Sequence, residues 1–173
     1  MHDPAPDRIV YTQAQIAGRV AELGAAITAA YPDGELLVLA LLKGSFVFVA
    51  DLVRQIRRPL QIDFVIAASY GADTVSSGEV RLVYDPEVEL AGKHVLLVED
   101  IVDSGKTIER LVPRLRERGP RTLELCALLH KRLAKRLALD ARWVGFEAPK
   151  RFLVGYGLDH AGTYRNLPYI ASL

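Results

Sequence analysis

The chain has 173 residues, 50% of them hydrophobic and 25% charged, and its 22 basic and 21 acidic residues leave a formal net charge of +1. This length suits one domain with a sizeable core, and the balanced charge provides no field that would draw the protein to nucleic acid or to a membrane surface. We therefore predict one domain over residues 1–173 that binds its ligand through a local site.

Membrane insertion, secretion and disulfide bonding are not expected. The longest apolar run, Leu36 to Leu42, is far shorter than the roughly 20 residues that cross a bilayer, and the first ten residues lack the basic-then-apolar pattern of a signal peptide. Cys126 is the only cysteine, which excludes an internal disulfide and a thiolate metal cage. The sequence predicts a cytoplasmic protein.

The first predicted elements are a helix and a buried strand. Thr12 and Gln15 have the spacing of a capping box, and the residues that follow at helical intervals are apolar. These residues are Ile16, Val20, Leu23 and Ile27. After a turn at residues 31–34, the unbroken apolar run Leu36 to Leu42 is typical of a strand covered on both faces.

Lys43, Gly44 and Ser45 follow this strand and precede an apolar helix from Phe46 to about Ile56. A cation, a glycine and a hydroxyl between a strand and a helix can hold an anion. Taken alone, a lysine at the end of a strand is more often just solvated.

A strand is expected at Gln61 to Ala67 and another at Glu79 to Tyr84. The polar, glycine-bounded residues 69–78 lie between them. Such a loop is mobile until a ligand orders it; its composition fits a plain hairpin end equally well.

The stretch Val95 to Thr107, VLLVEDIVDSGKT, is the most informative in the chain. Its first four residues indicate a buried strand, and Glu99 and Asp100 follow at the carboxyl end, with Asp103 close behind. In α/β folds, ligands bind at this end of the strands. The acids suit a polyhydroxylated sugar or a Mg²⁺ ion.

The turn Ser104-Gly105-Lys106-Thr107 leads into an amphipathic helix that ends near Gly119. Backbone N–H groups at the start of a helix bind anions, so we expect a phosphate there. A Walker A loop is excluded because it needs a glycine five residues before Gly105, where this chain has Asp100.

The remaining strands are predicted at Thr122 to Leu129, Arg142 to Phe146 and Phe152 to Tyr156, the last two arranged like a hairpin. Strands alternate with helices early in the chain. The order favours an α/β fold with a mostly parallel central sheet flanked by helices. We expect its core at about residues 36–130, and a small β-containing hood from about residues 1–12 and 142–173.

The residues VEDIVDSGKT resemble the 5-phosphoribosyl-1-pyrophosphate (PRPP) signature of the type I phosphoribosyltransferases. The segments Leu42 to Ser45 and Phe152 to Ile170 are similar to the 6-oxopurine (hypoxanthine-guanine) branch of that family. The resemblance implies a Mg²⁺-dependent enzyme that transfers ribose 5-phosphate from PRPP to N9 of hypoxanthine or guanine. It also implies a homodimer or homotetramer with small-molecule substrates, PRPP and a 6-oxopurine.

The resemblance implies roles for the residues that bind PRPP. Glu99 and Asp100 would hold the ribose hydroxyls and the metal, and residues Ser104, Gly105, Lys106 and Thr107 would hold the 5′-phosphate. Asp103 would be the general acid/base at purine N7.

Other loops receive roles from the same resemblance. Lys43 and Gly44 would bind pyrophosphate together with Arg165, and the peptide bond before Lys43 is typically cis in the family. Ser69 and Tyr70 would begin a lid that keeps water from the activated sugar.

For the purine, the resemblance implies a hydrogen bond from Lys131 to O6, stacking on Phe152 and backbone contacts at Leu153. Asp159 would hold Mg²⁺. Without the resemblance, Phe152 has the character of a core aromatic and Arg165 that of a surface residue.

Two alternatives differ in substrate or class. A xanthine- or pyrimidine-preferring phosphoribosyltransferase would share the PRPP loop, and His160, where the family commonly has tyrosine, leaves the preference among purines open. A regulator that keeps the fold but binds RNA would need a basic face, which the near-neutral charge does not favour.

Overall fold

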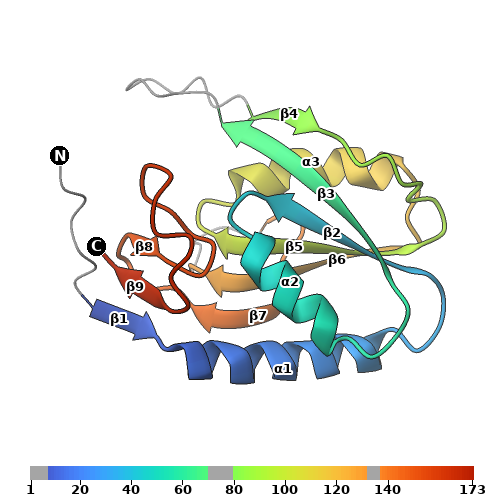
Figure 1. The fold of residues 1–173 in the computed structure, drawn as a ribbon. Helices are drawn as coiled ribbons and strands as arrows, with labels where there is room; N and C mark the ends of the chain where they lie inside the picture. Colours follow the sequence, from blue (N-terminus) through green and yellow to red (C-terminus); the bar gives the residue numbers. More distant parts are fainter. Residues whose placement is uncertain (1–7, 70–79, 132–136) are drawn as a thin grey trace.

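The computed structural model describes residues 8–69, 80–131 and 137–173, which form two sheets flanked by three helices (Figure 1). The larger sheet has the strand order β4-β3-β2-β5-β6-β7. Its strands are β2 (Leu36–Leu42), β3 (Gln61–Ser69), β4 (Val80–Tyr84), β5 (His94–Val102), β6 (Thr122–His130) and β7 (Ala141–Glu147). All neighbours pair in parallel except β4, which is antiparallel at the edge beside β3. The predicted mostly parallel α/β sheet is confirmed.

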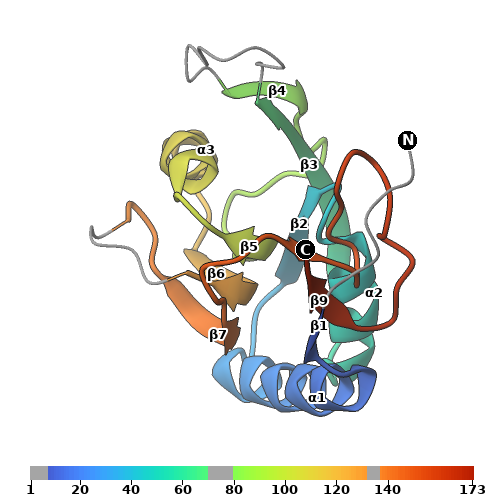
Figure 2. The ribbon, with the colours of Figure 1, turned by 90° about the vertical axis from the view of Figure 1, so that its left-hand side faces the viewer.

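Helices cover both faces of this sheet (Figure 2). The helices α1 (Gln13–Ala30) and α2 (Phe46–Gln55) pack on one face, and α3 (Lys106–Glu117) packs on the other. Because β2 is covered on both sides, its first six residues are buried, as its unbroken apolar run predicts. The capping box at Thr12 is also confirmed.

The smaller sheet has the antiparallel order β1-β9-β8 and combines both ends of the described chain. Its strands are β1 (Arg8–Tyr11), β8 (Leu153–Val154) and β9 (Ile170–Ser172). It lies beyond the end toward which the parallel strands point (Figure 1). This sheet forms the predicted hood over the carboxyl ends of the central strands.

The predicted hairpin between residues 142–146 and 152–156 is wrong. The first segment is β7, which pairs in parallel with β6 and extends the large sheet, whereas β8 belongs to the hood. Helix α1 packs against β7. The Arg19 guanidinium donates to the backbone oxygens of Val144 and Gly145, and the rings of Tyr31 and Trp143 lie 5.8 Å apart, measured between centroids. The core therefore extends to residue 147, and the hood starts later than the predicted boundary at 142.

Two further details bear on the site. Strand β5 continues to Val102, so Glu99 and Asp100 lie within the strand rather than beyond it. Ser69 ends β3, but Tyr70, the other residue of the predicted lid, lies outside the described residues. Within the described ranges, no helix combines the length and apolar character needed to cross a bilayer.

Candidate active site

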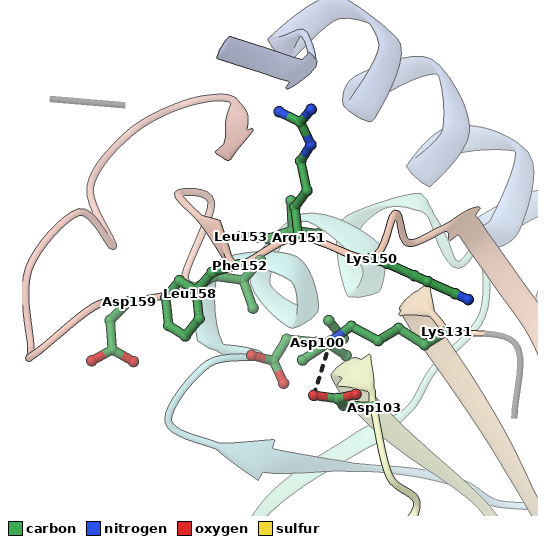
Figure 3. A pocket seen from close by; sticks show the side chains of 10 residues that line it. Asp100, Asp103, Lys131, Lys150, Arg151, Phe152, Leu153, Leu158 and Asp159 are labelled. Carbon is green, nitrogen blue, oxygen red and sulfur yellow. Dashed lines mark ion pairs between the residues drawn. The ribbon is translucent and has the colours of Figure 1, made fainter. Parts of the chain in front are cut away.

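A cavity of about 510 Å³ lies between the carboxyl ends of the central strands and the hood (Figure 3). Its walls come from β5 and β6 on one side and from the segment after β7 on the other. The lining residues are Asp100, Ile101, Asp103, Lys131, Lys150, Arg151, Phe152, Leu153, Leu158 and Asp159. Six residues that the sequence predicts for a site, far apart in the chain, thus line one cavity.

Asp103 and Lys131 form an ion pair on the wall of this cavity, with 3.0 Å between Lys131 Nζ and Asp103 Oδ2. The register of the sheet brings them together, because Val102 of β5 is level with His130 of β6 and the Lys131 N–H donates to the Val102 carbonyl at 2.9 Å. An ammonium donor and a carboxylate are therefore held side by side, facing the same space.

Phe152 offers an aromatic surface at this cavity. The residue is 54% exposed, so the reading of Phe152 as a core aromatic is wrong. Its backbone is fixed by β8 and by a hydrogen bond from the Leu173 N–H to the Phe152 carbonyl at 3.1 Å. The His160 ring packs perpendicular to the Phe152 ring, with 5.4 Å between centroids and 89° between planes. The neighbouring Arg151 side chain points away from the acids (Figure 3).

The predicted phosphate loop forms a separate small cavity of about 80 Å³ at the start of α3. Gly105 precedes the helix with a φ of 72°, and a Cβ there would overlap the Leu137 side chain. The first N–H groups of a helix have no backbone acceptor within it and can bind an anion; here the Lys106 N–H makes only a long bond, of 3.5 Å, to Ser104 Oγ. The Lys106 side chain is exposed and lines neither this cavity nor the larger one.

Glu99 and Asp100 point to opposite faces of β5, as successive residues of a strand do. Glu99 lines the small cavity and Asp100 the large one. Glu99 is buried, and its Oε2 has no hydrogen-bond partner within the described chain. Burial, reinforced by the negative charge of Asp100, raises the pKa of Glu99 well above its ordinary value.

The Lys43 loop lies next to Asp100. The Leu42–Lys43 peptide bond is cis, which confirms the expectation drawn from the resemblance. A Cβ on Gly44 would overlap the Asp100 carboxylate, and a Cβ on Gly157 would overlap the Gly44 carbonyl. The missing side chain at Gly44 therefore leaves room for the Asp100 carboxylate, and the missing side chain at Gly157 lets the hood approach the Lys43 loop.

Arg165 and Asp159 form an ion pair in the hood, with 2.6 Å between Arg165 Nη2 and Asp159 Oδ1. The Asp159 Oδ2 accepts from the Gly162 N–H at 2.8 Å. Arg165 is half-buried, so it is less exposed than the sequence alone suggests. Its charge is instead fixed in place beside an acid that lines the large cavity.

The donors present fit Mg²⁺. Asp100 and Asp159 offer hard oxygen ligands to the large cavity, while no group of three or more His, Cys, Asp or Glu residues forms a metal cluster within the part of the chain that is described. Mg²⁺ is commonly bound by one or two carboxylates, with water and substrate phosphates completing its shell.

Sequence reasoning missed several residues that shape the site. Gly157 contacts the Lys43 loop, Leu137 packs against the phosphate loop, and Leu158 lines the large cavity. Gly155 and Gly157 lie close together in the sequence, and glycines of this kind can mark a place where two backbone segments approach closely. For Gly157 this is the signal that could have been used. Nothing local marks Leu137.

The chain is similar in sequence and in structure to known phosphoribosyltransferases. Residues 9–161 match the family model described as the phosphoribosyl transferase domain. The chain is 44% identical to hypoxanthine-guanine phosphoribosyltransferase of Dictyostelium discoideum over 169 residues, covering 95% of this chain and 94% of the relative. It is 42% identical to hypoxanthine phosphoribosyltransferase of Haemophilus influenzae over 168 residues, covering 95% and 94%.

The solved structure of a hypoxanthine-guanine phosphoribosyltransferase from Bacillus anthracis is similar, with a TM-score of 0.91 at 43% identity. The match covers 98% of this chain and 99% of that one. The two proteins are therefore similar in sequence and in structure over nearly their whole lengths. The chain belongs to the phosphoribosyltransferase family.

Proposed function

We propose that the protein transfers ribose 5-phosphate from PRPP to N9 of hypoxanthine or guanine, giving IMP or GMP and pyrophosphate. The observation that carries this proposal is the Asp103–Lys131 pair, which shares one cavity with the exposed ring of Phe152. In a 6-oxopurine, O6 and N7 lie on the same edge of the ring. A purine stacked on Phe152 can present that edge to both side chains.

Each residue of the base site then has a distinct task. Lys131 donates to O6, and since an ammonium group cannot accept a hydrogen bond, it selects against the amino group of adenine. Asp103 accepts or returns the proton at N7 as general acid/base. Phe152 stacks on the base, and the Leu153 backbone meets its edge.

The PRPP residues surround the base site. The N–H groups of residues 104–107 bind the 5′-phosphate, and Glu99 and Asp100 bind the ribose hydroxyls. The raised pKa of Glu99 suits a hydrogen bond to a hydroxyl better than a metal, so among the predicted metal ligands we assign Mg²⁺ to Asp100 and Asp159. When bound, Mg²⁺ supplies positive charge that neutralises the leaving pyrophosphate.

The chain itself contributes positioning and charge. As the bond at C1′ breaks, negative charge grows on the pyrophosphate, and Lys43 and Arg165 stabilise it. The phosphate loop and the base site fix the two reacting atoms relative to each other, which supplies a large share of the catalysis. A cytoplasmic location and assembly into a dimer or tetramer stay predictions from the sequence.

The test is an absorbance assay of nucleotide formation with PRPP, Mg²⁺ and one purine at a time. We expect product with hypoxanthine or guanine and none with adenine. Faster turnover of xanthine than of both other 6-oxopurines would favour the xanthine alternative. No product with any 6-oxopurine, together with retention on RNA in moderate salt, would favour the regulator.

A further inference from the structure

A buried tyrosine joins the hood to helix α2. The Tyr156 hydroxyl donates to Asp51 Oδ2 at 2.6 Å, although Tyr156 follows β8 and Asp51 lies in the middle of α2. Tyr156 is 5% exposed and has a φ of 51°, uncommon outside glycine. Burial, reinforced by the Asp51 carboxylate, raises the pKa of Tyr156, so the hydroxyl keeps its proton and acts as the donor.

At one end, the bond reaches the Lys43 loop. Helix α2 begins at Phe46, directly after that loop. Ser45 is fully buried and connects the two, because its Oγ donates to the Leu41 carbonyl at 2.7 Å and its own carbonyl accepts from the Val49 N–H at 2.8 Å. Asp51 therefore belongs to the same rigid segment as Lys43.

At the other end, the bond reaches Arg165. The Tyr156 N–H donates to the Leu167 carbonyl at 2.8 Å, and the Gly157 N–H donates to the Arg165 carbonyl at 3.0 Å. The Arg165 guanidinium returns a bond to the Gly157 carbonyl at 2.6 Å. Tyr156 therefore directly precedes Gly157, whose carbonyl accepts the hydrogen bond from the Arg165 guanidinium.

The Tyr156 ring belongs to the same buried core cluster as the apolar residues of α2, but open space borders this cluster on the side of Arg165. A cavity of about 460 Å³ separates α1, α2 and the Arg165 segment. Asp51, Tyr156 and Arg165 all line it. Because this space is open, the hydrogen bond and the contact of Gly157 with the Gly44 carbonyl add to the packing of the Tyr156 ring in setting the distance between α2 and the Arg165 segment.

We propose that Tyr156 and Asp51 are positioning residues that hold Arg165 at the correct distance from Lys43, so that both cations meet the pyrophosphate group of PRPP. This inference rests on the proposed function, because it requires PRPP as the ligand. It assigns a role to two residues that contact no reacting atom.

The test compares Tyr156→Phe with the wild type, since the substitution removes the hydroxyl and keeps the ring. Isothermal titration with PRPP and Mg²⁺ should show a dissociation constant raised roughly threefold to tenfold. The KM for hypoxanthine should change less than twofold, because the base site does not use this contact. Asp51→Ala should reproduce the loss, and Asp51→Asn, which keeps an acceptor oxygen, should recover part of it.

Tyr11→Phe is the matched control. The Tyr11 hydroxyl also joins the hood to the large sheet, through the Glu147 carbonyl at 2.5 Å, but it is connected to neither pyrophosphate residue. Its removal should leave PRPP affinity unchanged. If Tyr156→Phe binds PRPP as tightly as the wild type, or loses thermal stability without losing PRPP affinity, the inference is wrong. If the wild type itself binds no PRPP, the proposed function fails instead.

Discussion

Replacing Gly44 with alanine tests how closely the Lys43 loop is fitted to Asp100. A Cβ on Gly44 would lie 2.5 Å from Asp100 Cγ and would overlap Oδ2, whereas real Cβ atoms essentially never approach another atom closer than 3.0 Å. The φ of Gly44 is not positive, so the alanine backbone itself is unstrained. The carboxylate must therefore retreat by more than about 1 Å.

A displacement of about 1 Å at a reacting centre costs roughly 10²-fold in rate, or about 2.7 kcal/mol of transition-state stabilisation. We expect Gly44→Ala to lower kcat/KM by about this factor. Stability should change little, because the displaced group is the end of a flexible side chain. Steady-state kinetics and thermal melting measure the two effects separately.

Two further variants serve as controls for Gly44→Ala. Gly18→Ala introduces a Cβ with no atom within 4 Å in helix α1, so it should keep full activity and add up to about 1 kcal/mol of stability. In an Asp100→Ala background, Gly44→Ala should cost almost nothing, because the group it displaces is gone. Full additivity of the two losses, or wild-type activity of Gly44→Ala, would refute the proposed contact.

Three further outcomes are expected. Asp103→Asn should lower kcat by roughly 10²–10⁴-fold while leaving PRPP affinity within about threefold; equal turnover in steady-state kinetics would remove Asp103 from acid/base catalysis. The raised pKa of Glu99 means that the folded protein binds this proton more tightly than the unfolded chain, so stability falls as pH rises from about 4.5 toward the folded pKa. Glu99→Gln should abolish that decline, so that the variant unfolds at a higher denaturant concentration than the wild type at neutral pH. The expected gain in the free energy of unfolding is about 1.4 kcal/mol for each pKa unit between the folded and unfolded states. If the variant shows the same dependence of stability on pH as the wild type, the expectation is wrong. Gly105→Ala should cost about 1–2 kcal/mol from the positive φ, with a further cost from the overlap with the Leu137 side chain, and it should weaken PRPP binding. Calorimetry should show that Gly105→Ala costs less stability in a Leu137→Ala background than in the wild type, because the overlapping side chain is gone; equal costs in both backgrounds would contradict the overlap.

The sequence predicts the elements well where a local pattern determines them. The apolar run Leu36–Leu42 and the capping box at Thr12 have the predicted positions. The pairing of β7 was missed, because parallel and hairpin arrangements leave the same alternation in a short strand. In the structure β7 pairs with β6 and is bound by Arg19 of α1, and both contacts come from distant parts of the chain.

The same division applies to the site. The cluster of Asp100, Asp103 and Lys131 could be predicted because a specific motif and the ends of parallel strands converge there. The Tyr156–Asp51 bond could not, since neither residue has a local signature and the contact depends on how the hood folds back. Long-range geometry of this kind is settled by packing.

The pairing of β1 with β9 has a consequence for synthesis on the ribosome. Arg8 is in register with Ser172, and Ser172 is also in register with Leu153, next to Phe152. The nascent chain emerges amino end first, so β1 must wait for a partner that is translated more than 150 positions later. The hood strand next to Phe152 is therefore completed only after the strands of the large sheet have left the exit tunnel.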